Sequence, residues 1–394
     1  MNMKKIIIVI IALFSGSIYL QAQSGTDKIM VAVEQNNTTL KALKAHFDAE
    51  KQGTRTGIFL QNPEVEFNYL WGSPAAIGNR TDISVTQTFD FPSAYHFKNQ
   101  IADYKNAQFD LEYQKEYRSL ILKTRLLCAD LTYLNALSRE LTRRKQNAGV
   151  VAEAFRSKFD SGDINILDYN KAKVNLINAE KALESVAIER EAVLGNLTGL
   201  NGGIRPELED TAYQNQTLPD NFETWYGEME TQSPVLQWLK QEIAISQKQE
   251  KLNAALSLPK LQAGYMSENV VGQQFQGITA GISIPLWENS NKVKYAKART
   301  VAVQGAEADA KLQFYNHLQG LFQKAVTLQK TLTDFRQKLN GVGNNALLQK
   351  ALTHGEISLT EYMLEFSIYY ESYRQLLEME RDFSKTVAEL NQYK

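Results

Sequence analysis

Short segments of the chain alternate between apolar and polar residues, and this alternation predicts β-strands. We expect strands over about residues 63–71, 82–91, 259–268 and 276–285. A period of two that separates an apolar from a polar face is typical of a sheet lying between two different solvents. In the first half of the chain, the expected apolar face carries Val65, Phe67, Tyr69, Trp71, Ile83, Val85 and Phe89, and the polar face carries Glu64, Glu66, Asn68, Asp82, Ser84, Thr86 and Thr88.

These segments have the length of tilted transmembrane β-strands, which is about 9–11 residues. An ordinary soluble sheet covered by helices is the alternative interpretation. Four strands cannot close a barrel, and lipid does not tolerate open sheet edges. A membrane location therefore requires several copies of the chain to pool their strands, and three copies would supply about twelve.

Between the strand pairs, the chain has long stretches without proline, which is the strongest helix breaker. We expect long helices over about 93–160, 165–198, 288–354 and 358–392. At a rise of about 1.5 Å per residue, the first would span roughly 100 Å. Apolar residues recur every three or four positions along these segments, which favours coiled-coil packing. Amphipathic helices of a soluble bundle are the alternative.

The two halves of the chain repeat each other. Residues 159–169 match residues 352–362, and Gly355 lies 193 residues after Gly162. The same offset separates Pro92 from Pro285, each of which stands between a strand and a long helix. We therefore expect a duplicated strand–strand–long-helix unit. The predicted organisation is a first repeat over 23–200, a linker over 201–219 and a second repeat over 220–394.

The N-terminus has the pattern of a cleavable secretory signal peptide over residues 1–22. Lys4 and Lys5 precede the apolar run 6–14, and Ala22 offers a small residue at the cleavage point. A transmembrane anchor is the alternative, although the apolar run is short for that role. The mature chain is therefore expected to leave the cytoplasm.

Composition limits the chemistry further. The 43 Lys and Arg residues nearly balance the 44 Asp and Glu residues, which argues against nucleic acid as a partner. Cys128 is the one cysteine, so neither an intrachain disulfide nor a cysteine metal cluster can form. We find no catalytic triad, zinc-protease or phosphate-loop pattern. The sequence therefore predicts no catalytic residues, no cofactor, no metal site and no enzyme activity.

Taken together, the signal peptide, duplicated halves, paired strands and long helices resemble the TolC-like outer membrane efflux family. The resemblance implies a mainly α-helical fold with a small β part, assembled as a homotrimer. Twelve strands would form one outer membrane β-barrel, continued by a periplasmic α-helical coiled-coil tunnel. It also implies a periplasmic adaptor (a membrane fusion protein) and an inner membrane pump of the RND type as partners.

The resemblance assigns roles to particular residues. Acidic residues near the tunnel entrance would be Asp168 and Glu361, with Glu365 one position beyond the place of the family's second acid, which is Leu364 here. The alternative is that Asp168 and Glu361 cap the return helices. Pro92 and Pro285 would mark the barrel-to-helix junctions. The adaptor would dock on two tips, formed by Ser161, Gly162, Asp163, Ile164 and Asn165, and by His354, Gly355, Glu356, Ile357 and Ser358.

The predicted function is thus a passive outer membrane channel of a tripartite efflux system, with a large periplasmic part. Trp71 and Trp287 would be anchors at the membrane interface. Heavy-metal cations and drugs both remain open as substrates. The alternative is a soluble periplasmic coiled-coil adaptor or scaffold, which the alternating strands speak against.

Overall fold

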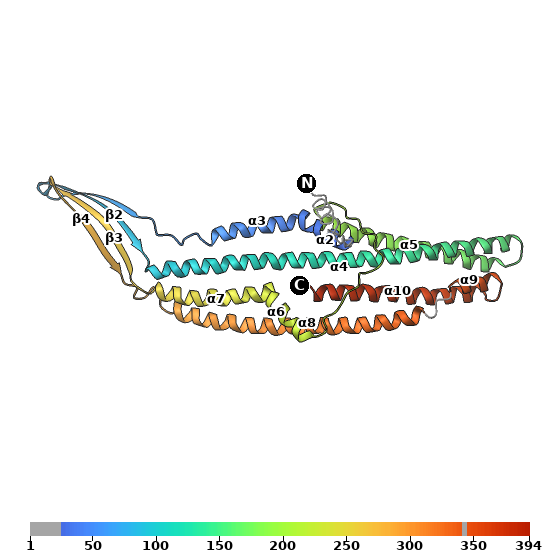
Figure 1. Ribbon diagram of the computed structural model, residues 1–394. Helices are drawn as coiled ribbons and strands as arrows, with labels where there is room; N and C mark the ends of the chain where they lie inside the picture. The colour runs from blue at the N-terminus through green and yellow to red at the C-terminus, as the bar shows by residue number, and fades with distance from the viewer. Residues whose placement is uncertain (1–24, 341–344) are drawn as a thin grey trace, which may run out of the picture. The chain divides into compact units, whose positions relative to one another are not determined.

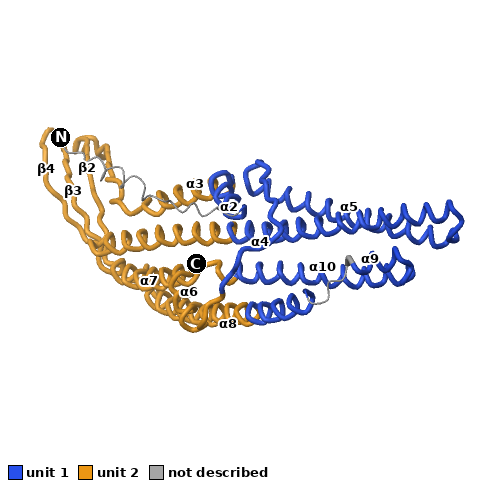
Figure 2. Tube along the Cα trace, turned by 45° about the vertical axis from the view of Figure 1, so that its right-hand side comes forward, with its two compact units in different colours: residues 1–38, 121–217, 325–389 blue, residues 39–120, 218–324, 390–394 orange. Residues whose placement is uncertain are grey.

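The computed structural model describes residues 25–340 and 345–394. The signal peptide predicted over residues 1–22 lies outside the described residues. The chain divides into two compact units, each built from separate stretches of sequence (Figure 2). Unit 1 comprises residues 1–38, 121–217 and 325–389, and unit 2 comprises residues 39–120, 218–324 and 390–394.

Figure 1 shows the helices and strands of the described residues. The predicted linker 201–219 consists of turns and irregular backbone. The elements are α2 (Gly25–Asn36), α3 (Thr38–Gly53), β1 (Glu64–Trp71), the 3₁₀ turn η1 (Ala75–Ile77), β2 (Asn79–Phe89), α4 (Pro92–Asp160), α5 (Ile166–Leu200), α6 (Phe222–Gln232), α7 (Pro234–Ala255), β3 (Lys260–Val270), β4 (Gln273–Ser283), α8 (Lys292–Asn340), α9 (Asn345–Thr353) and α10 (Leu359–Leu390).

Unit 2 contains the antiparallel sheet, whose strand order is β1-β2-β3-β4. The β3–β4 turn falls on Val271 and Gly272, which have φ values of 51° and 82°. Two consecutive positive φ angles are typical of the tight hairpin turn whose twist matches the strands. The turn explains why these strands, predicted over 259–268 and 276–285, occupy 260–270 and 273–283 instead.

Two hydrophobic clusters stabilise the helices of unit 2. Near the sheet, Ala94 of α4 packs with Ile245 and Leu252 of α7. In the second cluster, Trp225 of α6 packs with Leu318 of α8 among further aromatic side chains. Burial of large aromatic side chains supplies much of the stability of such clusters.

Unit 1 is a helical assembly with its own buried clusters. One joins Phe155 of α4 and Ala172 of α5 to Tyr362 and Phe366 of α10. The buried Asn135 side chain of α4 donates a hydrogen bond to the Leu208 carbonyl at 2.8 Å and so fixes the linker. The linker is therefore packed against the helices rather than free of them.

The helix predicted over 288–354 needs correction at its start. Helix α8 begins at Lys292, because Asn291 has a φ of 64°, which a right-handed helix does not allow. Residues 288–291 instead form turns, with the Ser290 N–H bonded to the Trp287 carbonyl at 3.1 Å. Residues 341–344, which the prediction included, lie outside the described residues; α9 follows them.

In the described part of the chain, no helix combines the length and the apolar character needed to cross a membrane.

Candidate functional sites on the sheet and at the helical turns

One face of the sheet in unit 2 is apolar and exposed. Its register aligns Val65, Val85, Tyr265 and Ile278 in one row across all four strands. The exposed fraction reaches 92% at Ile278 and 71% at Val65. Apolar side chains in contiguous exposed rows mark a surface that meets another apolar phase or another protein.

The opposite face of the sheet is polar. Arg80 forms ion pairs with Asp82 at 2.8 Å and with Glu268 on the neighbouring strand at 3.2 Å. The next rows on this face align Glu66 with Ser84, and Glu64 with Thr86. Because side chains alternate along a strand, the polar and apolar rows lie on opposite sides of the same sheet.

Strands β1 and β4 form the two edges of this sheet. Each edge strand has one row of backbone N–H and C=O groups that its own sheet does not pair. An edge strand of eight or eleven residues with exposed apolar side chains is a template for another strand. Both edges of the sheet are therefore suited to pairing with further strands.

The two prolines at the predicted junctions occupy different positions. Pro92 is the first residue of α4, where a proline costs no helical hydrogen bond. Close by, Asp90 forms an ion pair with Lys98 at 2.9 Å. Pro285 instead lies in the connection between β4 and α8, and Trp287 beside it is 81% exposed.

The two glycine turns of unit 1 have the same backbone. Gly162 and Gly355 have φ values of 80° and 73°, in the left-handed region that glycine tolerates. After α4, the Asp163 N–H donates to the Lys158 carbonyl at 2.8 Å, and after α9 the Glu356 N–H donates to the Ala351 carbonyl at 2.9 Å. These six-residue closures are typical of the Schellman motif that ends a helix.

Side chains around the two turns are mostly polar and exposed. Ile164 and Ile357 are exceptions, because both pack against the buried cluster of α4, α5 and α10. Two apolar residues not predicted as part of the tips, Ile166 and Leu167, are 46% and 66% exposed at the start of α5. Two apolar residues in the first turn of a helix were the available signal.

Each turn is followed by a capped helix. The Asn165 side-chain oxygen accepts a hydrogen bond from the Asp168 N–H at 3.0 Å. In the second turn, the Ser358 hydroxyl accepts from the Glu361 N–H at 3.2 Å, and the Glu361 carboxylate accepts from the Ser358 N–H at 2.8 Å. The second arrangement is a capping box. Both acids are therefore held at helix starts.

The acids differ in what neutralises them. The Asp168 carboxylate forms an ion pair with Lys171 at 3.2 Å. The position equivalent to Lys171 is Leu364, and among the described residues no cation lies within ion-pair distance of Glu361. Hydrogen bonds from Ser358 lower the pKa of Glu361, which keeps this carboxylate ionised. Glu365 is exposed one helical turn later on the same face of α10.

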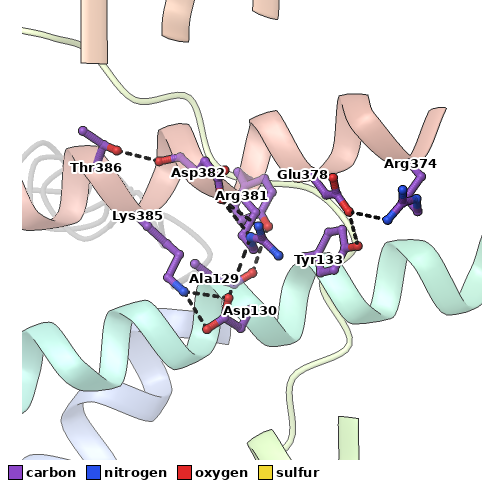
Figure 3. A network of polar contacts seen from close by, with 10 residues as sticks. Ala129, Asp130, Tyr133, Arg374, Glu378, Arg381, Asp382, Lys385 and Thr386 are labelled. Carbon is purple, nitrogen blue, oxygen red and sulfur yellow. Dashed lines mark hydrogen bonds and ion pairs between the residues drawn. The ribbon is translucent and has the colours of Figure 1, made fainter. Parts of the chain in front are cut away.

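A polar network fastens α10 to α4 in unit 1 (Figure 3). Lys385 binds both oxygens of Asp130 at 2.8 Å, and the Arg381 guanidinium lies 4.8 Å from the centre of the Tyr133 ring. The Tyr133 hydroxyl donates to Glu378 at 3.3 Å, and burial raises the pKa of Tyr133 to about 12. The network holds the helix that carries Glu361 and Glu365.

Metal chemistry finds little support in the described residues. No group of three or more His, Cys, Asp or Glu side chains there is arranged to hold a metal ion. Burial raises the pKa of the Cys128 thiol to about 12, so the thiol stays protonated and packs as a small apolar group.

No protein-family model matches the chain, and no curated protein sequence matches it. Solved structures do match the chain. CusC, described for its transmembrane channel formation, matches with a TM-score of 0.78 over 93% of this chain and 91% of CusC, at 11% identity. The Campylobacter jejuni outer membrane channel CmeC matches with a TM-score of 0.74 over 94% of this chain and 85% of CmeC, at 13% identity.

The open state of the Neisseria gonorrhoeae outer membrane channel MtrE also matches, with a TM-score of 0.69 over 93% of this chain and 88% of MtrE, at 14% identity. At these identities the likeness concerns the fold. It confirms the mainly α-helical, TolC-like channel fold that the sequence resemblance predicted, whereas the trimeric barrel and the duplicated repeat stay predictions. The chain has the fold of these outer membrane channels.

Proposed function

We propose that the chain is an outer membrane efflux channel that passively conducts substrates out of the periplasm. The observation that carries this proposal is the sheet, with one exposed apolar face, one polar face and two open edges. The known channels with this fold support the same function. No chemistry is needed in such a conduit, because the energy comes from a partner.

The open edges support a homotrimer. In lipid every backbone polar group must find a partner, so β1 of one copy would pair with β4 of the next. Three copies would close a barrel of about twelve strands, which is an even number as in bacterial outer membrane barrels. The row with Val65 and Ile278 would then face lipid, and the row with Glu64 and Thr86 would face the lumen.

The glycine turns are proposed as docking points for a periplasmic adaptor bound to an inner membrane pump of the RND type. Their residues 161–165 and 354–358 are mostly polar and exposed. Leu167 adds exposed apolar surface beside the first turn, which a helical adaptor could cover. The proposal applies equally to pumps for heavy-metal cations and pumps for drugs.

Glu361 is proposed as the charged residue of the periplasmic aperture, with Glu365 as the neighbouring acid. A threefold assembly would place three copies of an ionised, uncompensated carboxylate around one axis, where they would attract cations. Asp168 contributes less to this field, because Lys171 neutralises it. Its main role in this proposal is at the start of α5.

The mass of the assembly tests the channel proposal. We expect the full chain to leave membranes only with detergent and to give a protein mass of about three protomers by light scattering. A monodisperse monomer or dimer in plain buffer would remove the barrel. The sheet would then belong to a soluble adaptor or scaffold.

Conductance tests the aperture. We expect channels in planar bilayers to be blocked by millimolar Mg²⁺ from the periplasmic side, and Glu361→Gln to relieve this block. Glu189→Gln removes one exposed carboxylate from α5 and serves as the charge-matched control. Unchanged block in Glu361→Gln would exclude the aperture role while leaving the channel itself intact.

A further inference from the structure

A pocket in unit 2 is not explained by conduction. It has a volume of about 370 Å³ and lies between α4, α7 and α8. A volume of this size holds a small polar molecule rather than a single ion. The charged and polar residues that line it include Lys105, Glu242, Ser246, Asn253, Lys292 and Arg299.

A buried polar arrangement lies behind Ser246, which lines the pocket. Ser246 and Thr300 are only 3% and 7% exposed, and their hydroxyl groups are hydrogen-bonded at 2.7 Å. The Thr300 hydroxyl also donates to Glu250 at 2.6 Å. Buried hydroxyl groups would cost free energy without such partners, so this arrangement gives Ser246 a fixed position in the pocket wall.

The carboxylate that lines the pocket is already engaged. Glu242 accepts a hydrogen bond from the buried Gln108 side chain at 3.0 Å and forms an ion pair with Arg299 at 3.2 Å. These contacts hold the Glu242 carboxylate against α4 and α8. Its charge is therefore compensated before any ligand enters.

Among the residues that the structure describes, two ammonium groups of the pocket have no acidic partner. Lys292 donates to the neutral side chain of Asn289 at 2.9 Å. No carboxylate among the described residues lies within ion-pair distance of Lys105 or Lys292. The pocket as a whole has an excess of positive charge, even when Glu250 behind Thr300 is included. Such a site attracts anions with several oxygen acceptors.

The pocket begins at the base of the sheet. Asn253, near the end of α7, donates to the Lys292 carbonyl at 3.2 Å, and Asn289 donates to the Leu256 carbonyl at 2.6 Å. These bonds join the segment that leads into β3 to the segment that follows β4. In the proposed channel, a membrane surface would lie at this end of the strands.

We propose that this pocket binds a phosphate-bearing anion of the size of a phospholipid headgroup, held by Lys105 and Lys292. A phosphate group offers several acceptor oxygens to the two ammonium groups, and the side chains of Gln249 and Asn253, which also line the pocket, offer polar partners for a glycerol moiety. Phosphate binding itself depends only on the pocket. Its assignment to a membrane lipid rests on the proposed outer membrane function.

The test is calorimetric titration of the full chain in a nonionic detergent. The probes are dihexanoylphosphatidylglycerol and glycerol 3-phosphate, with glycerol as the uncharged control. Lys105→Gln/Lys292→Gln removes both proposed contacts. Lys294→Gln/Lys297→Gln removes the same charge from exposed positions of α8 that do not line the pocket. All four lysines are exposed, so none of these substitutions disturbs a buried contact.

We expect both phosphate probes to bind, glycerol not to bind, and added salt to weaken binding. The pocket variant should weaken binding by about tenfold or more, as expected for losing charge-assisted hydrogen bonds, and the control variant by about twofold at most. Tighter binding of the lipid than of glycerol 3-phosphate identifies a headgroup as the source, and equal binding identifies a free phosphate compound.

Absence of binding by both probes, or equal weakening in the two double variants, would overturn the proposal. Light scattering on the same samples distinguishes failure of the pocket proposal from failure of the channel proposal. A protein mass of three protomers without phosphate binding would remove the pocket proposal alone. A monomer that binds glycerol 3-phosphate would retain the pocket and remove the channel.

Discussion

The two glycine turns of unit 1 share one backbone but carry different chemistry. Their chain reversals use equivalent hydrogen bonds, and each following helix is capped by the equivalent residue, Asn165 or Ser358. Around the first turn, Asp168 is paired with Lys171 and the neighbouring Leu167 is 66% exposed. The position equivalent to Leu167 is polar in the second turn, where Glu361 keeps its charge.

This comparison separates the features that the chain reversal requires from the side chains that each turn exposes at its surface. A left-handed residue and a cap suit a reversal of this kind between two helices, so glycine and a capping residue recur in both turns. The ion pair and the apolar surface are not required for the reversal. We therefore expect the first turn to serve mainly as a contact surface and the second mainly as a source of charge.

The largest expected difference concerns the aromatic residue that follows each acid. Tyr362 is 3% exposed and its ring lies 4.5 Å from that of Phe366, whereas the equivalent Tyr169 is half-buried and stacks on Phe159 at 5.6 Å. Tyr362→Ala should lower the free energy of unfolding by about 3 kcal/mol, and Tyr169→Ala by about 1 kcal/mol. Guanidinium titration of both variants measures this, and equal losses would contradict the unequal packing.

Replacement of Gly162 or Gly355 by alanine should lower the free energy of unfolding by similar amounts. Nothing lies within 4 Å of a Cβ built on Gly162 or Gly355, so substitution costs only the left-handed backbone conformation. We expect each alanine variant to lose about 1–2 kcal/mol of unfolding free energy.

Gly149 is the matched control, because it lies inside α4 and a Cβ there would meet only Leu176 at 4.0 Å. Gly149→Ala should raise the unfolding free energy by about 0.5–1 kcal/mol. A loss in Gly149→Ala comparable to that in the turns would show that crowding, rather than backbone conformation, dominates.

The caps are expected to differ little in stability. Asn165→Ala and Ser358→Ala each remove one hydrogen bond to the first turn of a helix, which costs about 1 kcal/mol. Replacement by glycine should cost only a few tenths of a kcal/mol. Thermal unfolding of the four variants would test this, and a larger loss on glycine than on alanine would contradict capping as the main role.

The charge of Glu361 predicts a small pH effect. Its folded-state pKa lies below the unfolded value, so its contribution to stability is present above about pH 4.5 and is lost as the pH falls through the folded pKa. The difference in unfolding free energy between the wild type and Glu361→Gln should therefore decrease as the pH is lowered from about 4.5 through the folded-state pKa. A difference that grows on acidification would show that the carboxylate is destabilised by its surroundings.

Of these substitutions, Leu364→Lys should change the free energy of unfolding least. Its main effect should be on Mg²⁺ block of the channel. It places an ammonium three residues after Glu361, as Lys171 stands after Asp168. The second turn would then resemble the first, and Mg²⁺ block in planar bilayers should weaken while the assembly stays intact. The reciprocal Lys171→Leu should expose the Asp168 charge and should leave block unchanged or stronger.

Local patterns in the sequence were enough to predict the strands and the glycine turns, because a period of two and a helix-ending glycine act over a few residues. The first and last residues of the helices and strands were less predictable. The start of α8 depends on the positive φ of Asn291, and the β3–β4 turn places a valine at a φ of 51°, which composition does not indicate. The sequence contained the i,i+3 spacing of Asp168 and Lys171, but only the structure shows that they pair.

The polar network and the phosphate pocket could not be predicted in this way. Asp130 meets Lys385, and Ser246 meets Thr300, only when helices from distant parts of the chain pack together. Neither pair has a periodic or motif-like signature. The sequence also left open whether Glu361 is a cap or an aperture residue, and the structure shows that its capping bonds leave its charge uncompensated.

The pairing of β2 with β3 has a consequence for how the protein folds. Strands β1 and β2, and β3 and β4, are close neighbours in sequence and can pair early. The central seam instead joins residues such as Phe89 and Leu261, between which lie the helices α4 to α7. Because closing so long a loop costs entropy before any strand contact forms, we expect the helical hairpins to form first and this seam to close late, as a slow step in folding.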